Sequence, residues 1–115
     1  FPVRHHAPGS AWGIGLRNAM VWTGDTRPIP ELLSHYGSGS ELIAHDCALH
    51  GNPSHSGIDD IEREYPQALR QRLVLYHYGS AADGEMLRAR GYRVAAPGDV
   101  IALADHQAAP DAGRG

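Results

Sequence analysis

The chain of 115 residues is long enough for one domain with a modest core, and its net charge of −3 gives no basic surface of the kind that most nucleic-acid binders have. Its single cysteine, Cys47, excludes an intrachain disulfide and a zinc site built on a Cys-x-x-Cys pair. No apolar run approaches 18 residues and no signal-like segment is present, which predicts a soluble, cytoplasmic protein without a membrane partner. The unusual count is eight histidines, and a metal or acid–base site is therefore worth looking for.

The predicted elements alternate along the chain. Apolar or alternating runs bounded by Gly, Pro and Ser predict strands at residues 1–5, 12–17, 19–23, 41–45, 72–77, 92–95 and 99–103. Helices are predicted from 28–33 onward, with prolines in the first turn, then over 58–65 behind an acidic first turn, and over 80–90 with Gly91 as the C-cap. We expect an α/β fold (α+β by some schemes) with a mixed sheet and helices on one face.

The ends of the chain have their own predictions. Residues 1–106 are predicted to form the folded domain, and residues 107–115 have no periodicity and are predicted to be a disordered tail. The chain starts at Phe1, without a methionine, in a run typical of the middle of a folded unit. We therefore expect a fragment or a processed chain.

Metal-capable side chains follow four of the apolar strands. They are His5, Asp25, the pair His45-Asp46, and His77. In open α/β sheets, sites form outside the strand ends, where side chains from separate strands can converge. Imidazole and carboxylate are ligands that zinc, manganese or iron would take. Four strand ends with metal-capable side chains in one small domain predict that these side chains form a common site.

Four segments of the chain resemble, in order, the second half of a metallo-β-lactamase-fold hydrolase. They are "VWTGDTRP", "ELIAHDCALHGNPSHSG", "RLVLYHYGS" and "YRVAAPGDVIAL". The resemblance covers residues 1–104 and is closest to the tRNase Z-like phosphodiesterase branch. It implies that the domain is the C-terminal half of the family's αββα sandwich.

The resemblance also implies roles for individual residues. Asp25 would bridge two metal ions and His77 would ligate the second. Either His5 or His6 would ligate the first, and His5 is preferred because it matches the family's short "HxxP" lead-in. His55 would help to protonate the leaving oxygen, or would merely border the helix that follows it. Asp46 would orient His55, and His55 and Asp46 are thus the predicted catalytic pair.

These roles imply a parent enzyme with two zinc, manganese or iron ions, which hydrolyses a phosphodiester through a metal-bound hydroxide. A lactone or ester hydrolase of the same superfamily is the alternative. The partner would then be a small-molecule or phosphodiester substrate, and a nucleic-acid partner stays open.

The family's leading HxHxDH motif is absent from the chain, which leaves about three ligands for two metals. We therefore expect this chain to hold no metal, or one adventitious ion, and to be inactive by itself. A second hypothesis is a non-catalytic structural or interaction module. Half of a sandwich would leave an apolar sheet face bare, which predicts a missing N-terminal half, self-association or a domain swap.

Overall fold

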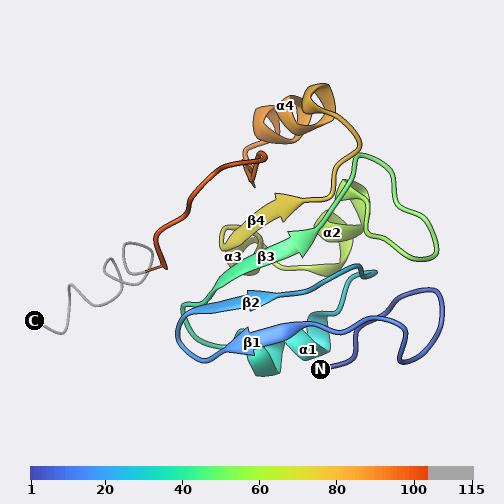
Figure 1. Ribbon diagram of the computed structural model, residues 1–115, viewed down its shortest axis with the longest axis vertical. Coiled ribbons are helices and arrows are strands. Elements are labelled where there is room, and N and C mark those ends of the chain that lie inside the picture. Colours follow the sequence, from blue (N-terminus) through green and yellow to red (C-terminus); the bar gives the residue numbers. More distant parts are fainter. Residues whose placement is uncertain (104–115) are drawn as a thin grey trace, which may run out of the picture.

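The computed structural model describes residues 1–103, and the chain builds one sheet with helices packed against it (Figure 1). The elements in chain order are β1 (Ile14–Leu16), β2 (Met20–Trp22), α1 (Pro30–Tyr36), β3 (Leu42–Asp46), α2 (Ile58–Glu64), α3 (Gln67–Arg70), β4 (Leu73–Tyr76), α4 (Ala81–Ala89) and β5 (Arg93–Val94). This is an α+β chain with a mixed sheet, which confirms the predicted fold class.

The sheet has the order β1-β2-β3-β4-β5. β1 is antiparallel to β2, and the later strands run parallel to one another with Val21 opposite Ile43, and Ala44 opposite Val74. The carboxyl ends of β2, β3 and β4 consequently meet at one edge of the sheet. Binding sites of parallel sheets form outside such an edge.

The helices cover one face of the sheet, with α1, α2 and α3 behind it in Figure 1. Successive side chains of a strand point to opposite faces, so Val21, Ile43 and Leu75 face the helices and are buried with Leu33 of α1 and Ile61 of α2. On the other face, β1 and β2 expose Ile14, Leu16 and Trp22. One face of the sheet thus packs into the hydrophobic core, and the other face is exposed to solvent over β1 and β2.

Local sequence explains how the helices begin. α1 starts with Pro30 in its first turn, where a missing N–H costs nothing. α2 follows Gly57, whose N–H is accepted by the Asp60 carboxylate at 2.9 Å, and α4 follows Ser80, whose hydroxyl accepts the Asp83 N–H at 3.2 Å. Both acidic side chains lie in the first turn, where they favour the helix dipole.

Two predicted strands are wrong, and one helix was missed. Residues 1–5 make only one bridge, between Pro2 and Trp12, before the chain turns. Before residues 99–102 the chain makes a turn, in which the Asp99 carboxylate accepts the Ala96 N–H at 2.8 Å. Residues 99–102 themselves pair with no strand within residues 1–103. The missed helix is α3, one short turn set off from α2 by Pro66.

Within residues 1–103, no helix is long and apolar enough to cross a membrane. The predicted tail at 107–115 and the end of the predicted domain at 104–106 lie outside the described residues.

Candidate functional site

Four acidic and histidine side chains gather at the carboxyl edge of the sheet. Asp25 follows β2, Asp46 ends β3, His77 follows β4, and His55 comes from the loop before α2. Each offers one ligand atom, and these atoms all lie within 4.8 Å of one another. The structure thus brings together four of the five residues singled out from the sequence.

Asp46 lies at the centre of this cluster, with its side chain fully buried. Its Oδ2 accepts the Thr26 N–H at 2.9 Å and the His55 Nδ1–H at 2.7 Å, and its Oδ1 lies 3.3 Å from His77 Nδ1. Burial raises the pKa of the Asp46 carboxyl, and the hydrogen bonds from His55 and Thr26 oppose that rise. Three donors thus surround a carboxylate that would be costly to bury alone.

The fifth residue, His5, stands beside the cluster rather than within it. Its ring lies edge-on to the ring of His55, with centroids 5.2 Å apart, and its Nδ1 is 3.0 Å from the carbonyl oxygen of Ser54. Its neighbour His6 is exposed and touches His5 by its ring. His5 is therefore nearer to the cluster than His6, as the sequence pattern preferred, although its role stays a prediction.

The three imidazoles of His5, His55 and His77 share one arrangement. In each, Nδ1 contacts a protein oxygen that can only accept, which assigns the proton of the neutral ring to Nδ1. The Nε2 lone pair is then left for a ligand, and a ring nitrogen fixed in this way is the usual state of a metal-binding histidine. His77 also has a left-handed backbone, with φ of 66°, which is rare for a residue with a side chain.

A second histidine lies directly behind the cluster. His45 precedes Asp46 in β3 and points to the opposite face, where it is fully buried and burial lowers its pKa to about 4. Its Nε2 lies 2.7 Å from the Tyr65 hydroxyl, and its Nδ1 lies 2.7 Å from the carbonyl oxygen of Asp46. His45 therefore holds the backbone of Asp46 and supports the site from the core.

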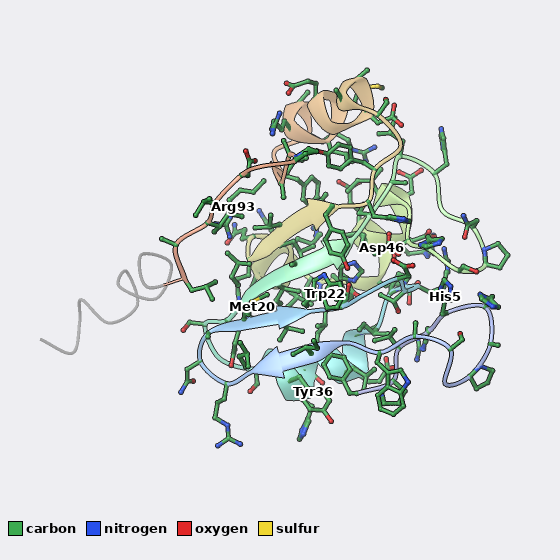
Figure 2. The ribbon with its side chains drawn as sticks, in the orientation of Figure 1. His5, Met20, Trp22, Tyr36, Asp46 and Arg93 are labelled. Carbon is green, nitrogen blue, oxygen red and sulfur yellow. The ribbon has the colours of Figure 1, made fainter. Side chains whose placement is uncertain are left out.

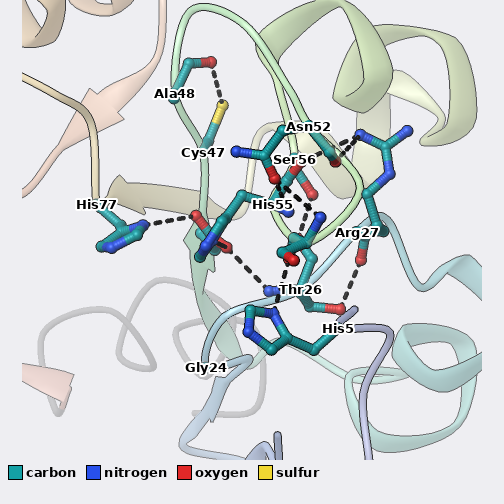
Figure 3. A network of polar contacts seen from close by, with 12 residues as sticks. His5, Gly24, Thr26, Arg27, Cys47, Ala48, Asn52, His55, Ser56 and His77 are labelled. Carbon is teal, nitrogen blue, oxygen red and sulfur yellow. Dashed lines mark hydrogen bonds and ion pairs between the residues drawn. The ribbon is translucent and has the colours of Figure 1, made fainter. Parts of the chain in front are cut away.

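The sequence analysis missed the residues that hold the surrounding loops. Thr26 and Arg27 follow Asp25 directly, and Figure 3 shows them between the loops of His5 and His55. Ser56 donates its hydroxyl to the Thr26 carbonyl at 2.7 Å, and Asn52 accepts the His55 N–H at 2.9 Å. A signal for the second contact was present, because Asn-Pro-Ser is typical of a turn closed by an Asn side chain.

The donor set suits a divalent cation such as zinc or manganese. It combines two carboxylates with two imidazoles, and the imidazoles are oriented by the contacts described above. The nearby thiol of Cys47 does not add to it, because burial raises its pKa to about 12 and keeps it a neutral thiol. The residues present thus have the chemistry to hold a divalent cation.

Comparison with known proteins identifies the family. The family model described as "Anti-Pycsar protein Apyc1" matches residues 1–101, which is most of the chain. The chain therefore belongs to the anti-Pycsar protein Apyc1 family. No curated protein matched it.

This match corrects the family and the function that were predicted from the motifs. The assignment to the metallo-β-lactamase-fold hydrolases, with the tRNase Z-like branch, is replaced by the anti-Pycsar family. The phosphodiester, lactone and ester hydrolase predictions rested on that resemblance and are corrected with it, since the family description names an antagonist and no reaction. Short motifs such as "TGDT" describe a polar turn at a strand end, and such a turn does not decide a reaction.

Proposed function

We propose that this chain is a non-catalytic binding module, which opposes a Pycsar defence by capturing a cyclic nucleotide. The family name states what its members counter, a defence based on cyclic nucleotides. A protein that binds the nucleotide tightly would remove it from its receptor without altering it. Of the functions predicted from the sequence, the interaction module is the one that agrees with the family.

The observation that carries the proposal is the cluster of Asp25, Asp46, His55 and His77 at one edge of the sheet. A cyclic nucleotide is a phosphodiester anion. The cluster would bind a divalent cation, and that cation would supply the positive charge for the phosphate oxygens. The exposed His77, half of whose side chain is open to solvent at 51%, lies on the side from which a ligand can enter.

We propose a cytoplasmic location for the module. Cys47 is a free and buried thiol, and within residues 1–103 there is no disulfide. A chain of this kind suits a reducing compartment, where a cyclic-nucleotide signal would also have to be met.

The experiment is a calorimetric titration of 3′,5′-cyclic nucleotides into the protein, with zinc, with manganese and with a chelator. We expect binding that the chelator weakens by at least about tenfold, and the same loss in Asp25→Asn, which keeps the size of the side chain but removes its charge. Glu85→Gln is the matched control, because Glu85 is an exposed carboxylate paired with Arg88 on α4.

Chromatography of the nucleotide recovered after binding completes the test. Intact nucleotide at full recovery would support capture. Turnover to a linear nucleotide would overturn the non-catalytic proposal, and so would the absence of binding under all three conditions.

A further inference from the structure

The loop at residues 49–57, which presents His55, has no helix or strand of its own. Asn52 closes it from within, accepting the N–H groups of Ser54 at 2.8 Å and His55 at 2.9 Å through its side-chain oxygen. These bonds shape the loop but do not attach it to the rest of the protein. The position of the His55 ring therefore depends on bonds that reach outside the loop.

Arg27 makes two of those outside bonds through one atom. Its Nη1 donates to the carbonyl oxygens of Asn52 at 3.2 Å and His55 at 3.1 Å (Figure 3). The same atom donates to Oδ2 of Asp60 at 2.7 Å. Two of these acceptors belong to the loop, and one of them is the carbonyl of His55 itself. A single guanidinium thus joins the His55 loop to the first turn of α2.

Asp60 keeps the guanidinium in place. Its side chain is only 15% exposed, and its Oδ2 also accepts the Gly57 N–H at 2.9 Å. The hydrogen bond from Arg27 lowers the pKa of Asp60 well below its usual range, so the carboxylate is charged at neutral pH. A charged pair of this kind, partly removed from water, is stronger than an exposed surface pair.

The backbone of Arg27 extends the same connection to His5. Its N–H donates to the Arg4 carbonyl at 2.7 Å, and the ring of His5 in turn contacts the Ser54 carbonyl in the His55 loop. Arg27 thus lies between the two loops that present imidazoles. It also follows Asp25 by two positions, so three of the candidate ligand segments, those of His5, Asp25 and His55, meet at this residue.

We propose that Arg27 is a positioning residue, which holds the His55 loop so that the His55 ring keeps its bond to Asp46 and its Nε2 remains available to a ligand. The inference rests on the proposed function only for its effect on nucleotide binding. Arg27 acts on the site through the loop and Asp60, which its Nη1 contacts.

The test uses NMR of side-chain nitrogens in the ligand-free chain, followed by nucleotide titration. In Arg27→Gln we expect the Nδ1–H signal of His55 to broaden or disappear as the ring leaves Asp46, with nucleotide affinity lowered about tenfold or more. Arg27→Lys keeps the positive charge and should retain much of the His55 Nδ1–H signal and of the nucleotide affinity. Arg63→Gln is the matched control, because Arg63 also donates to Asp60, at 2.7 Å, but is mostly exposed and has no bond to the loop.

If Arg27→Gln does not fold, Asp60→Asn replaces it in the test. This variant keeps Arg27 and removes only the charge of Asp60 that anchors the guanidinium, so we expect a smaller release of the His55 ring from Asp46. An unchanged His55 signal in the folded Arg27 and Asp60 variants would overturn the inference. If the wild-type chain binds no nucleotide but His55 is still released by these variants, the proposed function fails and the positioning role stands.

Discussion

The hydroxyl of Tyr65 shows how single residues support the site. It accepts the Ile29 N–H at 2.7 Å, so its own proton is directed to His45 Nε2, and His45 must then donate through Nδ1 to the Asp46 carbonyl. Each hydrogen bond in this buried series thus has a defined donor and a defined acceptor. The tautomer of His45 follows from these contacts alone.

Tyr65→Phe should therefore be unusually costly for the loss of one oxygen. It leaves the Ile29 N–H and the His45 Nε2 without a partner in the core, and each costs about 1–3 kcal/mol, so we expect the free energy of unfolding to fall by about 2–6 kcal/mol. Urea denaturation measures this change in the free energy of unfolding. Tyr78→Phe is the control, because the Tyr78 hydroxyl makes a single partly buried bond, to Ala95, and should cost about 1 kcal/mol. Equal losses in the two variants would show that the His45 contacts are not as described.

At the scale of elements, α4 contains a glycine that local propensity does not explain. Gly84 lies in the middle of the helix and is buried, and a Cβ there would lie 2.8 Å from a ring carbon of Tyr78. The ring cannot move away freely, because its hydroxyl is bonded to the Ala95 carbonyl at 2.7 Å. The close approach of helix and ring thus requires glycine at this position.

Gly84→Ala should destabilise the protein by about 1–3 kcal/mol, although alanine is the better helix former. In a Tyr78→Ala background the same substitution should instead stabilise by up to about 1 kcal/mol, since the helix preference is then unopposed. Comparing the four proteins by urea denaturation tests both signs. A stabilising Gly84→Ala in the wild-type background would contradict the packing described here.

The elements that could be predicted are those with a strong local pattern. The strands predicted at 41–45 and 72–77 correspond to β3 (Leu42–Asp46) and β4 (Leu73–Tyr76) of the structure. The helix predicted at 80–90 corresponds to α4 (Ala81–Ala89). The strand at 1–5 failed because its pairing stops early. Phe1 and Val3 bond to Gly13 and Ala11, Pro2 between them has no N–H to donate, and the chain turns after Val3.

The site was predictable to the same degree. Asp25, Asp46 and His77 follow strands, and parallel strands bring their ends to one edge, so sequence order was enough to place them together. The position of His55 depends on contacts such as Arg27 with Asp60, which are 33 residues apart and leave no local pattern. The family also could not be read from short motifs.

At the scale of the whole molecule, the bare face of the sheet is the feature without a function. Ile14 lies opposite Trp22 across β1 and β2, so both side chains point to the same face, away from the helices. Figure 2 labels Trp22 on β2. With Trp12 and Leu16 they are 40–60% exposed. Together they present on the order of 400–500 Å² of apolar surface, near the upper end for a soluble monomer.

Among the partners predicted from the sequence, we propose a second copy of the chain as the occupant of this face. The patch supplies about half of the roughly 800 Å² per partner that a stable interface covers. The outer edge of the short strand β1 at residues 14–16 adds unpaired backbone groups next to it. Sedimentation equilibrium of residues 1–115 should show a dimer whose fraction rises with concentration. Ile14→Thr with Leu16→Thr should shift it to a monomer, because these changes keep β propensity but remove apolar area. Met86→Gln, an equally exposed apolar residue on α4, should leave the dimer unchanged. A wild-type chain that stays near 12.4 kDa at high concentration would show that a second copy does not cover this face.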